Sequence, residues 1–387
     1  MNQLSIQSIA QQNYAMIRKN FYQPETGLFL MYTDAYEPGR INLPTKEQVD
    51  SDIPNSNGFS TPIENSNYAS SQILDTLLYR YHVTRKVEHA EEARSIYRGL
   101  RHLYSVSKSP SFVPRGVLPD GVTHYKDVSI DHISFWLMAM WHYYRSPLSS
   151  HAERLDLRNV FASFAGDAER HGWTFRREDG LITFWANLED PTVPRAPLVF
   201  MFLLLAAYDS TGDTHWRDCY LAILNRNNRQ IIQQLSGELI SSEVSWVSSQ
   251  SIWLLDCLSQ LEDDSDIKEV YRRNMIKIAE NSPSQMEAHV KFEWNRACVD
   301  FDFRSLTHRN CLFGLISAAM CPDASVMQKC TELAEKVIRH YNYRRDAKII
   351  DLLDSVVRYY WVMASRGMLP YDPSLDVPED GTQTGIP

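Results

Sequence analysis

Hydrophobic and polar positions follow two alternating patterns along this chain. In the first pattern, apolar residues recur every three to four positions and charged residues fill the positions between them. The segment 325–341 is an example, because Val326, Cys330, Leu333 and Val337 repeat with a helical period. This spacing predicts helices with one buried face and one solvent face. We expect such amphipathic helices at 6–20, 89–106, 151–171, 215–235, 267–280 and 325–341.

The second pattern is apolar almost all the way round the helix. It is clearest in ISFWLMAMWHYY within 130–144 and in PLVFMFLLLAAY at 197–208. A helix that is apolar on every side of a water-soluble chain is buried on every side. We expect such inner helices at 68–81, 130–144, 197–208, 246–261, 311–320 and 349–364.

Six amphipathic helices that enclose six apolar ones satisfy both patterns at once. The sequence therefore predicts an all-α fold, an (α/α)6 barrel (toroid) of six helical hairpins. An α-solenoid and a pair of helical bundles are the competing architectures, but a solenoid does not need helices that are apolar all round. We expect one catalytic domain over 1–369 and a loosely held C-terminal tail over 370–387, which is rich in Pro, Gly and Asp.

The lengths of the connections between helices indicate on which face of the molecule the functional site lies. Apolar helices lead to the next amphipathic helix through short polar turns, whereas most of the return connections are long: 21–66, 108–128, 172–194, 236–242 and 281–303. The inner helices are expected to begin near 66, 129, 195, 243, 304 and 346. Their starts and the long loops then share one face, which is where binding residues usually lie. Helix N-termini carry positive partial charge, so this face favours anions.

Composition excludes several functions. The chain has 387 residues and a formal net charge of −9, without a Lys/Arg-rich block, which argues against nucleic acid as a partner. The longest apolar run, 197–208, is about half of the roughly 20 residues that cross a bilayer, so no membrane span is expected. No GxGxxG, P-loop, GxSxG or HExxH motif is present. We therefore expect neither a nucleotide cofactor nor a zinc-protease site.

The cysteines and the N-terminus bear on location. The six cysteines form no CxxC pair, and no His stands near them at a usual zinc spacing. We therefore expect reduced, buried thiols and no metal site. No signal peptide is visible at residues 1–14. These features favour a cytoplasmic location, or a periplasmic one if a signal peptide has been removed.

The segment 114–132 is the strongest candidate for chemistry. Asp131 falls in the first turn of an otherwise apolar helix, where it is either a helix cap or a general acid/base. Four polar or basic side chains stand close to it in the sequence: Arg115, His124, Tyr125 and His132.

Other inner-helix starts supply further candidates. Glu64 and Glu243 are expected as partner carboxylates for Asp131, with helix capping as the alternative role. The expected substrate-binding residues at these starts and in the loops are Asn67, Arg195, Arg304, His308, Trp185 and Trp246. A guanidinium gives two-point recognition of a carboxylate, and a Trp ring stacks on the flat face of a sugar. Pairing of Arg304 with nearby Asp residues is the alternative.

This arrangement resembles the six-hairpin glycosidase superfamily, and in particular its uronyl hydrolases and exo-uronidases, over about residues 5–365. The resemblance implies a glycoside hydrolase for uronate-containing oligosaccharides, with Asp131 as acid/base and Glu64 or Glu243 as its partner. The expected partner molecule is an anionic oligosaccharide, and a homodimer is compatible with the sequence. Two alternatives stay open. One is a polysaccharide lyase or sugar epimerase that uses His132, His308 or Tyr125 to abstract a proton. The other is a non-catalytic helical ring that binds a ligand.

Overall fold

A computed structural model describes residues 4–33, 41–51, 61–190, 193, 195–225, 245–284, 286, 312–340 and 349–376. The described chain is mostly helical, which confirms the all-α class. The amphipathic helices are α1 (Ile6–Phe21), α4 (Val87–Ser105), α6 (His151–Arg170), α8 (Thr214–Asn225), α11 (Ser265–Glu280) and α14 (Ala324–His340). The apolar helices are α3 (Ser66–Thr84), α5 (Ile130–Arg145), α7 (Ala196–Thr211), α10 (Ser245–Leu261) and α15 (Asp351–Ser365), and residues 312–319 are helical as well.

The burial of these helices follows the two sequence patterns. In α7 every residue from Leu198 to Ala207 is buried, so no side of its central turns faces water. In α4 the buried side chains include Ala93, Ile96, Leu100 and Leu103, which recur with the helical period. The hydrophobic effect therefore sorts the helices into an inner and an outer set.

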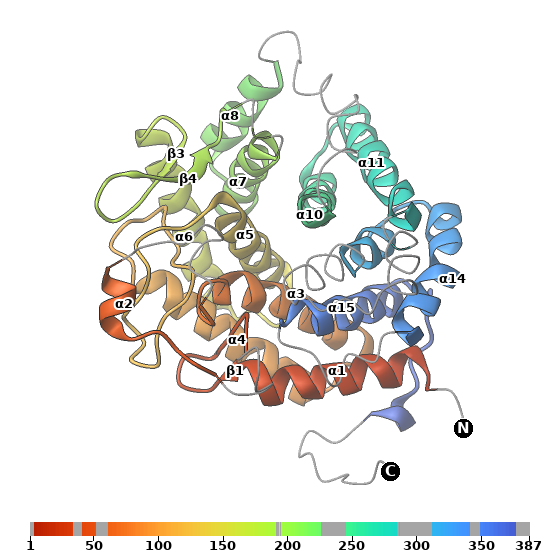
Figure 1. The fold of residues 1–387 in the computed structure, drawn as a ribbon. Helices are drawn as coiled ribbons and strands as arrows, with labels where there is room; N and C mark the ends of the chain where they lie inside the picture. Colours follow the sequence, from red (N-terminus) through yellow and green to blue (C-terminus); the bar gives the residue numbers. More distant parts are fainter. Residues whose placement is uncertain are drawn as a thin grey trace.

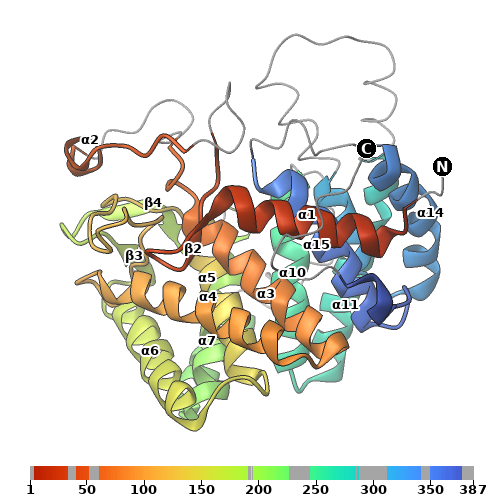
Figure 2. The same ribbon diagram turned by 90° about the horizontal axis from the view of Figure 1, so that it is seen from below.

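The inner helices lie around a common centre, and the outer helices lie against their outer sides (Figure 1). Along the chain, α3 packs against α5, α5 against α7, and α7 against α10. The last inner helix, α15, packs against α3, the first, and α1 packs on the outside of α15. Figure 2 shows the same neighbours from a second direction, with α3 beside α4 and α1 beside α15. The last inner helix, α15, therefore lies next to the first helices of the chain, α1 and α3.

Two of the long connections contain short antiparallel hairpins that the patterns do not predict. Strands β1 (Tyr22–Gln23) and β2 (Leu28–Phe29) follow α1, and β3 (Thr174–Arg176) and β4 (Ile182–Asn187) follow α6. A further short helix, α2 (Lys46–Asp50), lies between β2 and α3. Three of the four strands are only two or three residues long, and β4 does not alternate between apolar and polar residues, so the sequence predicts loops at these positions.

The core has one large and one small part. The large cluster of buried hydrophobic residues extends from Ile6 to Met363 and includes every inner helix. A separate small cluster lies between the long connections and is formed by Leu30, Val49, Ile63, Leu118 and Tyr125. It holds the connections 21–66 and 108–128 against each other, which fixes the loops beside the starts of α3 and α5.

The first residues of the expected tail contact α1. The side chain of Gln7 donates a hydrogen bond to Asp372 O at 2.7 Å and accepts one from Asp372 N at 2.8 Å. Gln11 donates to Asp376 Oδ1 at 2.6 Å, and a short 3₁₀ turn, η2 (Pro373–Leu375), lies between these contacts. Residues 377–387 lie outside the described residues.

Within the described part of the chain, none of the helices combines the length and the apolar character needed to cross a lipid bilayer.

Candidate functional site

The directions of the inner helices define two opposite ends of their assembly. One cavity is lined by residues at the ends of four inner helices: His82 in α3, Arg145 in α5, Gln260 in α10 and Ser365 in α15. Helices whose C-terminal ends meet at one cavity run in the same direction, so their starts gather at the other end. We call these places the helix-end cavity and the helix-start end.

Four predicted site residues form a chain of contacts at the helix-start end. Arg115 Nη1 lies 3.9 Å from Glu64 Oε1 and 3.4 Å from His132 Nε2. His132 Nδ1 lies 3.6 Å from Asp131 Oδ1. The structure therefore brings together two carboxylates, a guanidinium and an imidazole from α5 and from the loops that precede α3 and α5. With Arg195 they form what we call the helix-start cluster.

The environment of Asp131 keeps its carboxyl ionised. Burial opposes ionisation, but His132, Arg195 and a hydrogen bond from Ser129 together hold the pKa of Asp131 well below its usual range. Arg195 is the N-cap residue of α7, so its influence on Asp131 also shows that α7 starts close to the start of α5. A carboxylate with a depressed pKa acts as a base, a nucleophile or an anionic stabiliser, and not as a proton donor near neutral pH.

The imidazole of His132 is held in one orientation. Its Nε2 donates to Asn65 Oδ1 at 2.6 Å, and its Nδ1 lies 2.8 Å from Ser129 Oγ. The His132 side chain is 3% exposed, whereas that of Asp131 is 18% exposed. Asp131 is therefore the member of this pair that a substrate can reach.

Asn67 lies at the same end and is fully buried. Its backbone N–H donates to Arg115 O at 2.7 Å, and its Oδ1 accepts from Ser71 Oγ at 3.2 Å. Among the described residues, no hydrogen-bond partner is present for its Nδ2. Because buried donors in native proteins are almost always bonded, this N–H₂ group is a candidate to bind a water molecule or a hydroxyl of a substrate.

Two other predicted residues make contacts elsewhere. The Tyr125 hydroxyl lies 2.9 Å from Thr61 Oγ1, and its ring belongs to the small cluster between the long connections. His124 Nδ1 lies 2.6 Å from Val122 O, and its Nε2 lies 3.4 Å from Glu178 Oε1 next to β3. These contacts of both side chains hold loops together, although both residues are close to Asp131 in the sequence.

The other five predicted site residues lie in β4, in α10 or outside the described residues. Trp185 lies in β4 and Trp246 in the first turn of α10. Glu243, Arg304 and His308 lie outside the described residues.

A buried polar network between the inner helices was missed by the sequence analysis. Arg358 of α15 donates to Asp75 Oδ2 of α3 at 2.8 Å and to Gln72 Oε1 at 3.2 Å, and it lies 3.9 Å over the ring of Trp253 in α10. Both charged side chains are 1% exposed. Asp75 Oδ1 also lies 2.5 Å from His142 Nδ1 in α5. The available signal was the presence of charged residues such as Asp75 and Arg358 within helices expected to be buried, since a buried charge needs a partner.

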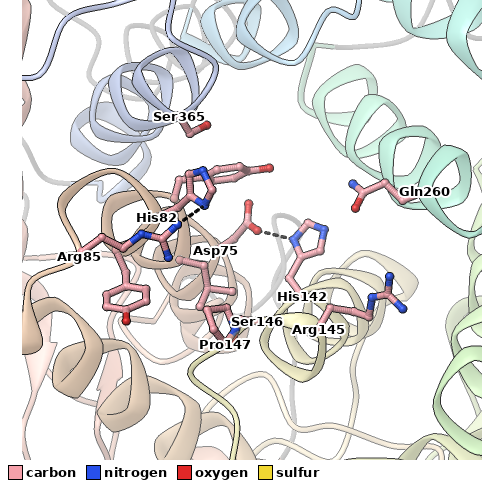
Figure 3. A pocket seen from close by; sticks show the side chains of 12 residues that line it. Asp75, His82, Arg85, His142, Arg145, Ser146, Pro147, Gln260 and Ser365 are labelled. Atoms are coloured by element: carbon pink, nitrogen blue, oxygen red, sulfur yellow. Dashed lines mark hydrogen bonds and ion pairs between the residues drawn. The ribbon is translucent and has the colours of Figure 1, made fainter.

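This network reaches the helix-end cavity, which has a volume of about 300 Å³. Figure 3 shows Asp75 directed toward His142 and Arg85 beside His82. The volume is at the lower limit for a small-molecule site. Arg85 is the C-cap of α3 and has a φ of 57°, a left-handed conformation that is costly for a residue with a side chain. The sequence analysis did not anticipate this cavity, because its residues come from the ends of helices far apart in the chain.

Asp354 is a second carboxyl with a strongly altered acidity, and it lies in the first turn of α15. Burial raises its pKa to about 7; nearby Asp351 and Asp75 add to this effect, and Arg358 opposes it. Its Oδ1 has no hydrogen-bond partner among the described residues. The pKa of Asp354 is therefore shifted in the opposite direction from that of Asp131.

Gly116 allows the loop that carries Arg115 to approach the start of α3. A Cβ at this position would lie 2.8 Å from Ser66 Cβ and would also clash with the carbonyl oxygen of Ile63. Gly116→Ala is expected to push the loop away and to lower the free energy of unfolding by about 1–3 kcal/mol. Urea denaturation measures the loss. Gly166→Ala in α6 is the control, since its nearest new contact is an ordinary 3.7 Å and alanine favours a helix. A stable Gly116→Ala protein would contradict this account of the loop.

The raised pKa of Asp354 predicts a pH-dependent effect on stability. A carboxyl with a folded pKa of about 7 contributes stability below its ordinary pKa of about 4, and this contribution is lost as the pH rises from about 4 to about 7. Asp354→Asn should therefore raise the free energy of unfolding relative to the wild type at pH 8, by up to about 4 kcal/mol. The gain should fall to about 1 kcal/mol at pH 4.5 and vanish only below the ordinary pKa of the carboxyl. Denaturation of both proteins at the two pH values measures it, and an equal difference at both would disprove the shift.

Neither a protein-family model nor a curated protein sequence matches this chain. The chemistry of the helix-start cluster is therefore the basis on which a function can be assigned.

Proposed function

We propose that this protein is a glycoside hydrolase that acts on uronate-containing oligosaccharides at the helix-start end. The single observation that supports this most strongly is the ionised Asp131 between His132 and Arg195, at a place where inner helices begin. A carboxylate base beside a guanidinium is the combination needed to hydrolyse a sugar that itself carries a carboxylate.

The proposal includes the complete architecture, a closed (α/α)6 barrel of six helical hairpins. Its support is the order of contacts, in which inner helices follow one another and α15 returns to α3. The buried helical residues 312–319 lie between α11 and α14 in the chain, where such a barrel has its fifth inner helix.

Two carboxyls divide the proposed catalytic work. Asp131 removes a proton from a water molecule, and the water oxygen bonds to the anomeric carbon as the glycosidic C–O bond breaks. The leaving oxygen takes a proton from a carboxylic acid, since a general acid must hold its proton near neutral pH. Asp354 has a pKa suited to that role, but it is buried beside Asp75 and Arg358. Glu64, paired with Arg115, and Glu243 remain the donors that the sequence analysis favours.

Basic groups give the site its preference for an anionic sugar. Arg195 binds the substrate carboxylate, and the partial positive charge of the inner-helix starts adds to the attraction. Asn67 is fully buried, so its Nδ2 acts on a sugar hydroxyl through a bound water molecule. Proton abstraction by His132, as in a lyase or an epimerase, is less well supported because both of its ring nitrogens already have partners.

Asp131→Asn is expected to lower kcat by about 10²–10⁴-fold, because an amide cannot accept the proton from water. Release of reducing ends from a panel of uronate-ended oligosaccharides measures the activity, and circular dichroism verifies the fold. The control is Asp179→Asn, which removes an exposed carboxylate that pairs with Arg177. Unchanged turnover in Asp131→Asn would remove Asp131 from the mechanism, and an unsaturated product absorbing in the ultraviolet would identify a lyase instead.

Arg195→Gln is expected to raise KM for a uronate substrate by about 10–100-fold, since a charge-assisted hydrogen bond is lost. The same variant should change KM little for the matching neutral oligosaccharide. Steady-state kinetics on the two substrates separates recognition of the carboxylate from a general loss of the site. Arg170→Gln, which changes an exposed arginine of α6, is the control. An equal effect on KM for both substrates would show that Arg195 does not recognise the substrate carboxylate.

A further inference from the structure

Three side chains with different donor atoms meet on the outer helices α6 and α8. Glu169 lies in the last turn of α6, and His215 and Cys219 lie one turn apart on α8. Their possible ligand atoms all lie within 4.8 Å of one another. None of the three belongs to the helix-start cluster or to the helix-end cavity.

The distances between these atoms match one face of a coordination tetrahedron. His215 Nε2 lies 2.9 Å from Glu169 Oε1 and 3.7 Å from Cys219 Sγ, and Cys219 Sγ lies 4.0 Å from Glu169 Oε1. Zinc bonds of about 2.0–2.3 Å at tetrahedral angles place such atoms about 3.3–3.6 Å apart. Small rotations of the side chains are therefore enough to bring all three onto one ion.

The geometry of helix α8 places His215 and Cys219 on the same side. Residues four apart in a helix point to the same side, so His215 and Cys219 face Glu169 together. The site is also accessible, because the side chain of His215 is 48% exposed and that of Glu169 is 37% exposed. Of the cysteines that the structure describes, Cys219 is the one that is not fully buried, and all of them are free thiols.

We propose that Glu169, His215 and Cys219 form a binding site for Zn²⁺ in which a water molecule completes the tetrahedron. A thiolate, an imidazole and a carboxylate favour Zn²⁺ over Mg²⁺ or Ca²⁺, which prefer sites made of oxygen alone. The ion joins the end of α6 to the start of α8. The expectation that no His stands near a cysteine at a zinc spacing is wrong, because His215 and Cys219 lie four residues apart on α8. The third ligand, Glu169, comes from a different helix.

Formation of the site releases a proton from Cys219. Burial, together with Glu169 and Asp218, raises the pKa of this thiol, so it is protonated until the ion binds. Zn²⁺ replaces the proton on sulfur, and the thiolate–zinc bond forms without any change of oxidation state.

Titration of the chelator-treated full chain with Zn²⁺ against a competing chromophoric chelator tests the site. We expect one ion per chain with a Kd below about 1 µM. Co²⁺ in place of Zn²⁺ should give a thiolate-to-cobalt charge-transfer band. Zn²⁺ at about 100 times its Kd should raise Tm by about 3 °C.

Cys219→Ser and His215→Gln should each weaken Zn²⁺ binding at least tenfold and reduce the rise in Tm, and Cys219→Ser should also abolish the cobalt band. The matched controls are Cys330→Ser, which changes a buried cysteine of α14, and His151→Gln, which changes an exposed histidine at the start of α6. Both controls should bind like the wild type. Binding that survives in Cys219→Ser, a cobalt complex without the thiolate band, or equal weakening in the controls would overturn the proposal.

Discussion

The salt bridge between Asp75 and Arg358 joins the first inner helix to the last. Both side chains are almost completely removed from water, so neither charge is tolerated without the other. A buried ion pair adds little net stability compared with well-packed apolar residues, but it penalises every arrangement that separates its partners. Here it holds α15 beside α3 and fixes how far one slides along the other. The positions of the inner-helix starts, and with them the candidate catalytic residues, depend on that alignment.

The helix-start end shows how one fold gives two carboxyls opposite properties. Asp131 has His132, Arg195 and Ser129 as neighbours, so its charged form is favoured in spite of burial. Asp354 has Asp351 and Asp75 near it, and Arg358, its counterion, already pairs with Asp75. Burial favours the protonated form of both carboxyls, and their different neighbours decide that the pKa of Asp131 falls while that of Asp354 rises. The two carboxyls come from helices that are far apart in the chain, α5 and α15.

Much of the helix-start cluster was predictable because its members lie at recognisable positions. Asp131 and His132 stand in the first turn of an apolar helix, and Arg115 precedes them in a loop shaped by Gly and Pro. Arg195 directly precedes another apolar helix. The same reasoning erred in grouping by closeness in sequence, since His124 contacts Glu178 beside β3 and not the cluster. Asp75 and Arg358 were also overlooked, because nothing local in the sequence shows that these two charges pair across helices.

The sequence by itself determined which segments are helices, which of them are buried all round, and which residues stand at their starts. These are local properties, because the periodicity of hydrophobic residues and the chemistry of a helix start depend only on residues within a few helical turns of one another. Only the tertiary structure decided which charges meet. The partnership of Asp75 with Arg358, the opposite acidities of Asp131 and Asp354, and the meeting of Glu169 with His215 and Cys219 all depend on distances between separate helices. Electrostatic and coordination energies vary with those distances, and no local pattern encodes them.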